Sequence, residues 1–229
     1  MKTIGMLGGM SWESTALYYR KINEETKRHL GGLHSARIAL VSVDFQEIET
    51  LQHEDDWATC AQILADRSRD IEAAGADFLL ICTNTMHLVA PQIEEAIGIP
   101  LLHIADATAT RIRSAGYEKI GLLGTRFTME QAFYRGRLEQ QGIEVLVPPE
   151  EDREIVHRVI YDELCRGEVR DDSRAEFLRI IDDLAARGAQ GVIEGCTEIV
   201  MLVQQTHTDV PLFDTTSIHA LEAVAEALR

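Results

Sequence analysis

The feature that most constrains the fold of this 229-residue chain is an internal repeat. Near the start, Gly5 and Gly8 belong to a short apolar segment that runs into a glycine-containing turn and then an amphipathic stretch. The same arrangement returns at Gly121 and Gly124, 116 positions later in both cases. A repeated segment of this length indicates two copies of one structural unit.

Two further matches follow in the same order. The apolar segment that leads into Thr83 aligns with the one that leads into Cys196, 113 positions later. The segment 100–104 aligns with 211–214, at an offset of 111. Offsets of 116, 113 and 111 differ only by small changes in loop length. Three ordered matches indicate a duplicated domain rather than a chance similarity of turns.

Apolar strand-like segments alternate with helical periodicity throughout, which is typical of βαβ units and parallel sheets. We therefore predict an α/β protein of two similar domains, each with a parallel four-stranded sheet, related by a pseudo-twofold axis. The first domain is expected to comprise residues 1–102 and 215–229, and the second residues 103–214. Strands are expected at 3–7, 36–43, 77–82, 100–104, 119–124 and 211–214, and helices after Ser11 and at 56–74, 153–164 and 215–229.

Composition excludes several classes of function. A formal net charge of −16 disfavours nucleic acid and anionic membrane surfaces, which are bound mainly through Lys and Arg. No apolar run approaches the roughly 20 residues of a membrane span, and the apolar run at the N-terminus is too short for a signal peptide. The four cysteines have no CxxC spacing, so we expect reduced thiols, no metal and a cytoplasmic protein.

The duplicated strand ends suggest a chemistry. In α/β proteins the carboxyl ends of parallel strands open onto the ligand crevice, so Thr83 and Cys196 are expected at equivalent places facing a crevice between the domains. One hydroxyl and one thiol on opposite sides of a small substrate have the geometry of a two-base racemase. The segment Gly5-x-x-Gly8-Gly9 lacks the GxGxxG spacing of a dinucleotide site, and we expect no cofactor.

Four motifs together resemble the aspartate/glutamate racemase family, which is independent of pyridoxal phosphate. They are the opening 5–11, Asn84-Thr85 with His87, the segment 123–125, and the segment 195–198. The resemblance covers the whole chain and implies a homodimer that acts on a small amino-acid substrate. It points to the subgroup described as L-aspartate/glutamate-specific or broad-specificity racemases.

The chain departs from the family at one catalytic position. The family has cysteine at both strand ends, whereas here Thr83 occupies the first and Cys82 falls one residue early. A shift of one residue turns a side chain to the opposite face of a strand, so Cys82 is expected in the core. We expect Cys196 to be a thiolate base, stabilised by backbone N–H groups at a helix N-terminus, and Thr83 to be the proton donor. A hydroxyl is a poor base, so racemisation should be asymmetric; the resemblance implies that the cysteine attacks the L-enantiomer.

Six further residues are predicted to bind substrate. Asn84, Thr85 and Thr197 follow the reactive positions and start helices, where their donors suit an α-carboxylate, although they could act only as helix caps. Met10 and Thr125 follow the two glycine turns and should border the crevice, although Met10 could equally be a core residue.

The sixth is Gln52, which occupies the region where the resemblance implies an arginine for a side-chain carboxylate. No arginine lies between residues 43 and 57, which favours broad specificity. Arg158 could compensate, but an arginine on an exposed helix face is the simpler interpretation.

The roles of three neighbours stay open. His87 could polarise Thr83 or serve as a capping or core histidine, and Glu198 could tune Cys196 or add favourable charge at a helix start. Glu194 is an acid on a strand that should be buried.

Three alternatives to a racemase remain. A single-cysteine decarboxylase of the arylmalonate type would use Cys196 alone, and a two-lobed amino-acid-binding protein would need no thiol at all. A cysteine hydrolase is disfavoured because no histidine and acid pair lies near Cys196 in the sequence.

Overall fold

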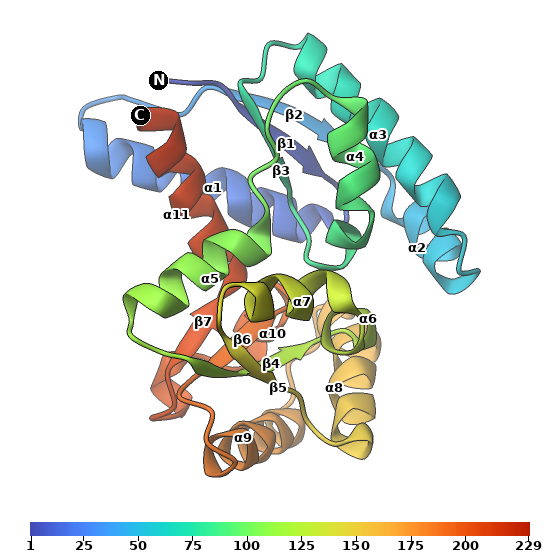
Figure 1. Ribbon diagram of the computed structural model, residues 1–229, viewed down its shortest axis with the longest axis vertical. Coiled ribbons are helices and arrows are strands. Elements are labelled where there is room, and N and C mark those ends of the chain that lie inside the picture. Colours follow the sequence, from blue (N-terminus) through green and yellow to red (C-terminus); the bar gives the residue numbers. More distant parts are fainter. The chain divides into compact units, whose positions relative to one another are not determined.

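The computed structural model describes all 229 residues, which fall into two compact α/β units (Figure 1). The first contains residues 1–104 and 219–229, and the second residues 105–218. The sequence boundaries at 102/103 and 214/215 lie within four residues of these limits. None of the helices is both long enough and apolar enough to cross a membrane.

The sheet of the first unit is parallel with strand order β2-β1-β3. These strands are β1 (Ile4–Gly8), β2 (Ile38–Ser42) and β3 (Phe78–Ile81). The prediction of a fourth strand at 100–104 is wrong in extent. A single β-bridge forms there, in which the Leu79 N–H donates to the Pro100 carbonyl and the Leu102 N–H donates to the Leu79 carbonyl. The segment does not extend into a strand because a helix begins at Ile104. The parallel direction expected for this segment is nevertheless present.

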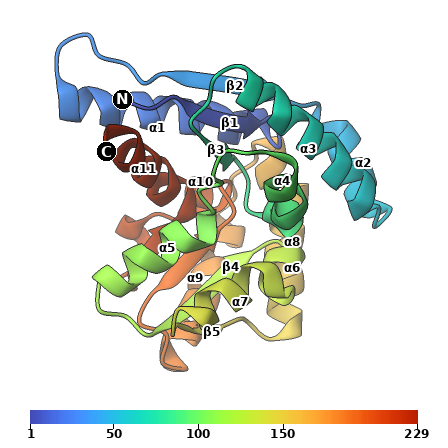
Figure 2. The ribbon, with the colours of Figure 1, turned by 45° about the horizontal axis from the view of Figure 1, so that its top comes forward.

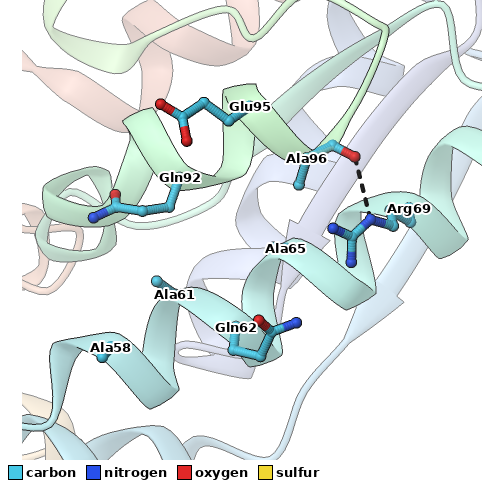
Figure 3. A pocket seen from close by; sticks show the side chains of 8 residues that line it. All are labelled: Ala58, Ala61, Gln62, Ala65, Arg69, Gln92, Glu95 and Ala96. Atoms are coloured by element: carbon cyan, nitrogen blue, oxygen red, sulfur yellow. Dashed lines mark hydrogen bonds between the residues drawn. The ribbon is translucent and has the colours of Figure 1, made fainter.

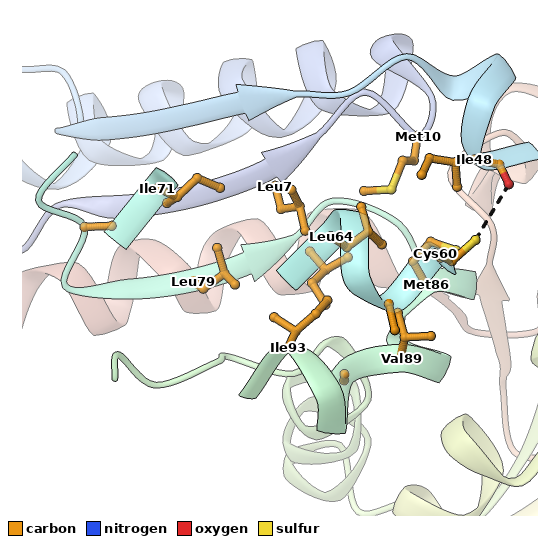
Figure 4. Close-up of a cluster of buried hydrophobic side chains, with 14 residues drawn as sticks. Leu7, Met10, Ile48, Cys60, Leu64, Ile71, Leu79, Met86, Val89 and Ile93 are labelled. Carbon is orange, nitrogen blue, oxygen red and sulfur yellow. Dashed lines mark hydrogen bonds between the residues drawn. The ribbon is translucent and has the colours of Figure 1, made fainter. Parts of the chain in front are cut away.

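Two helical layers cover this sheet, and alternate strand residues face each of them. Leu7 and Leu79 pack with residues of α2 (Phe45–His53), α3 (Trp57–Ala73) and α4 (Ala90–Ala96), as Figure 4 shows. Met6, Leu80 and Cys82 face α1 (Trp12–Leu30) and α11 (Thr215–Leu228) on the other side (Figure 2). Cys82 is fully buried, so its predicted core position is confirmed.

Local signals explain the helices of this unit. The predicted N-cap of α1 is confirmed, since the Ser11 side chain accepts a hydrogen bond from the Ser14 N–H. Helix α2 is not expected from its acidic sequence. It forms because Asp44 caps it by accepting from the Gln46 N–H at 3.1 Å, while Ile48 faces the core.

The second unit has a four-stranded parallel sheet of order β5-β4-β6-β7, as predicted. Its strands are β4 (Lys119–Gly124), β5 (Glu144–Leu146), β6 (Val192–Gly195) and β7 (Leu212–Asp214). Its helices are α5 (Ile104–Ser114), α6 (Arg126–Glu130), α7 (Ala132–Gln140), α8 (Glu150–Asp162), α9 (Asp171–Ala186) and α10 (Ile199–Leu202), with 3-10 turns η2 (Leu164–Arg166) and η3 (Gln205–His207).

The matched glycines occupy equivalent tight positions in the two units. A Cβ on Gly8 would lie 2.4 Å from the Thr15 side chain, and one on Gly124 would lie 3.1 Å from the Thr128 side chain. In both units the end of the first strand approaches a threonine of the following helix; a Cβ on Gly8 would overlap that threonine, and one on Gly124 would be tightly packed against it. The duplication inferred from sequence therefore has a structural counterpart.

One open hollow of the first unit, of about 430 Å³, lies between α3 and α4 (Figure 3). Arg69 borders it and donates from Nε to the Ala96 carbonyl at 3.2 Å. None of the predicted catalytic or binding residues lines this hollow.

Candidate active site

Cys196 follows the end of β6 and precedes the short helix α10. The half-buried thiol donates a hydrogen bond from Sγ to Glu198 Oε2 at 2.9 Å. Burial raises the pKa of the Cys196 thiol well above its usual value, and the negative charges of Glu198 and Cys165 raise it further. At neutral pH the thiol is therefore protonated.

This result corrects the prediction of a resting thiolate. The backbone N–H of Glu198 does lower the thiol pKa, as expected of a helix N-terminus, but this is the weakest of the influences on it. Helix α10 has only four residues, and the carboxylate at its start opposes the effect of the helix end. The arrangement is instead a thiol beside a carboxylate, and the carboxylate can accept the thiol proton.

Thr83 lies in the turn between β3 and the short 3-10 helix η1 (Thr85–Val89). Its carbonyl accepts a hydrogen bond from His87 Nδ1 at 2.7 Å, and His87 Nε2 accepts from the Ile104 N–H at 3.3 Å. The buried His87 thus fixes the backbone of the turn, and neither of these bonds involves the Thr83 hydroxyl. That hydroxyl is half-buried and makes no hydrogen bond within the chain, which leaves it available to a ligand.

The second unit brings together three of the predicted residues. Gly124 and Gly195 are register partners on neighbouring strands, so Thr125 and Cys196 follow side by side at the carboxyl edge of the sheet. The Thr125 side chain caps α6 by accepting from the Thr128 N–H. The Thr197 hydroxyl lies 3.1 Å from the Thr216 hydroxyl at the start of α11.

The first unit buries the other four predicted binding residues. Asn84 and Thr85 are buried in the turn after Thr83, and Asn84 makes no side-chain capping bond to η1. Met10 is a core residue in the cluster drawn in Figure 4. Gln52 is also buried, and its amide Nε2 donates to the Met86 sulfur at 2.8 Å.

Glu194 is buried on β6, two residues before the thiol. Only 3% of its surface is exposed, and its Oε1 is buried without a hydrogen-bond partner. Burial, and then the charge of Asp214 on the neighbouring strand β7, raise the pKa of Glu194 to about 8. Glu194 is therefore mainly a neutral acid at neutral pH. An acidic residue within an apolar strand was the one signal of this in the sequence.

The structure also brings Arg126 to the carboxyl edge directly after Thr125, where it lines a cavity with Arg158. Sequence reasoning did not select Arg126. Its position next to a predicted binding residue was the signal available. No group of three or more His, Cys, Asp or Glu side chains is arranged to hold a metal ion.

Comparison with known proteins finds similar proteins over nearly the whole length of the chain. The family model Asp/Glu/Hydantoin racemase matches residues 7–223. A crystal structure from Yersinia pestis, provisionally named Asp/Glu racemase, is 57% identical with a TM-score of 0.95, and the match covers 100% of both chains. An aspartate racemase homologue from Pyrococcus horikoshii OT3 is 34% identical with a TM-score of 0.86, again over 100% of both chains.

A curated relative extends this agreement. The broad specificity amino-acid racemase RacX of Bacillus subtilis (strain 168) is 22% identical over 230 residues, or 98% of either chain. The chain with this repeat, these two parallel sheets and these residues at their carboxyl edges therefore matches one family over nearly its full length. The chain belongs to the Asp/Glu/Hydantoin racemase family.

Proposed function

We propose that this protein is a cofactor-independent amino-acid racemase in which Cys196 and Thr83 act on opposite faces of the substrate α-carbon. The observation that carries the proposal is the thiol at the end of β6, hydrogen-bonded at 2.9 Å to Glu198. Thr83 supports it as the equivalent residue of the other repeat, with a half-buried side chain.

Because the pKa of Cys196 is raised, the thiol needs a proton acceptor in order to ionise. The carboxylate of Glu198 is hydrogen-bonded to the thiol and can accept its proton. The thiol passes its proton to the Glu198 carboxylate, and the resulting thiolate removes the α-proton of the L-enantiomer. The electron pair of the broken C–H bond delocalises into the α-carboxylate, where N–H and O–H donors such as those of Asn84 and Thr197 stabilise it. The Thr83 hydroxyl then protonates the opposite face. The proton held by Glu198 passes through solvent to the Thr83 oxygen, so that Glu198 is again a carboxylate, Cys196 a thiol and Thr83 a hydroxyl.

The two directions are unequal because the two groups differ as bases. A thiol with a carboxylate partner can give and take a proton near neutral pH, whereas a threonine hydroxyl is a far weaker acid and is not held ionised. Thr83 thus serves readily as a donor and only slowly as a base. Because the two enantiomers have equal free energy in water, kcat/KM is the same in both directions, and the asymmetry takes the form of a higher kcat together with a higher KM from L to D. We retain the expected homodimer as part of the proposal.

Chiral chromatography of product mixtures tests the function. Purified protein is incubated with L-aspartate, L-glutamate, L-alanine and L-methionine in turn, and the appearance of the D-enantiomer is followed. D-product from at least one of these supports the racemase. Release of carbon dioxide from a disubstituted malonate without racemisation would instead establish a decarboxylase, and tight binding with no turnover would establish a binding protein.

A Glu198→Gln variant should lose about 10²-fold or more of L-to-D turnover at pH 7, because the amide can accept a hydrogen bond but cannot take the thiol proton. Residual turnover should rise towards alkaline pH as the thiol ionises unaided. The measurement is a pH profile of the initial rate for wild type and variant. Equal rates at pH 7 would show that Glu198 only orients the thiol.

A further inference from the structure

Three buried histidines gather in the first unit beside the turn that carries Thr83. They are His87 in η1, His103 just before α5 and His219 on α11, and each is at most 2% exposed. The His87 ring meets the His103 ring at a centroid distance of 4.4 Å and the His219 ring at 6.0 Å. Imidazole rings are costly to bury unless their nitrogens are hydrogen-bonded, so the bonds of these rings show what the cluster holds in place.

His219 joins two distant segments of this unit. Its Nε2 lies 2.7 Å from the Leu102 carbonyl oxygen, which can only accept, so Nε2 carries a proton. Burial lowers the pKa of His219 to about 4, so the ring is neutral at pH 7 and Nδ1 is an acceptor. The Tyr18 hydroxyl of α1, which packs with α11 on the same face of the sheet (Figure 2), donates to that Nδ1 at 2.8 Å. One tautomer of His219 therefore links α1 to Leu102.

The segment at Leu102 is in turn bonded to the Thr83 turn. The Leu102 N–H donates to a carbonyl of β3, which fixes the segment on the sheet. Two residues later, the Ile104 N–H donates to His87 Nε2 at 3.3 Å, and His87 Nδ1 donates to the Thr83 carbonyl at 2.7 Å. A buried chain of hydrogen bonds, continued by two residues of backbone, thus runs from the Tyr18 hydroxyl to the backbone of Thr83.

The histidines are specific to the unit that carries Thr83. At the repeat offsets of 113 and 111, the equivalents in the second unit are Val200 for His87, Asp214 for His103 and Thr108 for His219. The tyrosine, by contrast, is common to both units. Tyr134 lies 116 residues after Tyr18, is also fully buried, and donates its hydroxyl to Thr108 at 3.3 Å. A buried tyrosine bonded to the equivalent position of a helix therefore belongs to the duplicated fold, whereas the extension through histidines does not.

The two sides of the proposed reaction differ in the same way. Cys196 has a proton acceptor, Glu198, hydrogen-bonded to its own sulfur. Thr83 lies in a turn between a strand and a 3-10 helix, and the direction of its hydroxyl depends on the backbone of that turn. A misplacement of about 1 Å in a reacting group can cost about 10²-fold in rate. The side that donates a proton through a hydroxyl therefore gains most from a fixed backbone.

We propose that Tyr18 and His219 are positioning residues that hold the Thr83 hydroxyl in its proton-donating orientation through the buried chain. The inference rests on the proposed racemase function and adds two fully buried residues to it. His87 is the last member of the chain, and His219 is the member that joins the helices to it.

The fate of the carbanion tests this inference. In deuterated water, the carbanion formed from the L-enantiomer either returns to L with a deuteron from Cys196 or receives a deuteron from Thr83 and becomes D. Tyr18→Phe removes the hydroxyl that fixes His219, so D formation should fall about tenfold while recovered L-substrate still gains deuterium. The ratio of deuterated L-substrate to D-product should rise at least about fivefold, which a loss of folded protein alone does not produce.

The repeat supplies the matched control. Tyr134→Phe removes the equivalent hydrogen bond of the second unit, and its ratio should stay within about twofold of wild type. His219→Thr introduces the residue that bonds this tyrosine in the second unit, so Tyr18 keeps a partner but the bond to Leu102 is lost. That variant should raise the ratio as Tyr18→Phe does. An unchanged ratio in both first-unit variants, or an equal rise in Tyr134→Phe, would overturn the inference and leave the racemase intact.

NMR of the imidazole nitrogens tests the chain without any turnover. At pH 7 the wild-type protein should show neutral rings, with the proton on Nδ1 in His87 and on Nε2 in His219. Tyr18→Phe should shift the His87 signals, whereas Tyr134→Phe should not. Such a shift supports the chain even if no amino acid is racemised. His87 signals that stay the same in Tyr18→Phe would contradict the coupling between α1 and the Thr83 turn.

Discussion

A Cys196→Ala variant is expected to lose at least about 10³-fold of L-to-D turnover, the upper part of the range for removing a positioned proton-transfer group. Alanine cannot accept the α-proton. The measurement is the initial rate of D-enantiomer formation with the best substrate of the panel.

The matched control is Cys165→Ser, which removes an exposed thiol of the same unit. It should keep the rate within a few-fold, since Cys165 affects Cys196 only through its charge. Thermal unfolding of both variants checks that the fold is intact. If Cys196→Ala turned over substrate as fast as the control, the thiol would not be the base.

A Glu194→Gln variant is expected to be more stable than wild type at alkaline pH by about 1–3 kcal/mol. The carboxyl pKa is about 8 in the folded chain against a usual 4.5, so the folded state holds the proton more tightly than the unfolded state. Stability from this group is thus greatest below pH 4.5, falls as pH rises to about 8, and stays low above it. The glutamine amide of the variant carries no charge to bury, and we expect less than the full difference of roughly 5 kcal/mol because the site relaxes on ionisation.

Urea unfolding at pH 5 and pH 8.5 measures this effect. The gain from Glu194→Gln should be at least twice as large at pH 8.5 as at pH 5, where Glu194 is protonated in the folded state. Glu118→Gln, at an exposed position of the same unit, should show no such difference. A gain of equal size at both pH values would mean that ionisation of Glu194 is not the cause.

The sequence was sufficient for the overall plan because the repeat is encoded in local features. Gly8 and Gly124 each abut a threonine of the next helix, and Ser11 caps α1 through its own side chain. Such contacts join residues a few positions apart, so they leave a regular pattern in the chain. The same holds for Cys82, whose core position follows from strand alternation alone.

Other features depend on partners that are distant in the sequence or on competing effects of similar size. Burial and the charge of Glu198 raise the pKa of Cys196, whereas the backbone N–H at the helix end lowers it. The sequence alone does not show which of these influences is larger. The cavity at Arg126 and Arg158 forms only when α6 packs on α8. Helix α2 was not predicted because its charged residues are also typical of a loop. Its contact with the core through Ile48 is visible only in the structure.

The most direct test of the two-group proposal is α-proton exchange in deuterated water, followed by NMR for each enantiomer of the best substrate. We predict rapid, Cys196-dependent deuterium incorporation from the L-enantiomer and at least about tenfold slower incorporation from the D-enantiomer, because Thr83 is a poor base. Equal exchange from both enantiomers would contradict the assignment of Thr83 as a donor only. Exchange that persists in Cys196→Ala would contradict the role of the thiol.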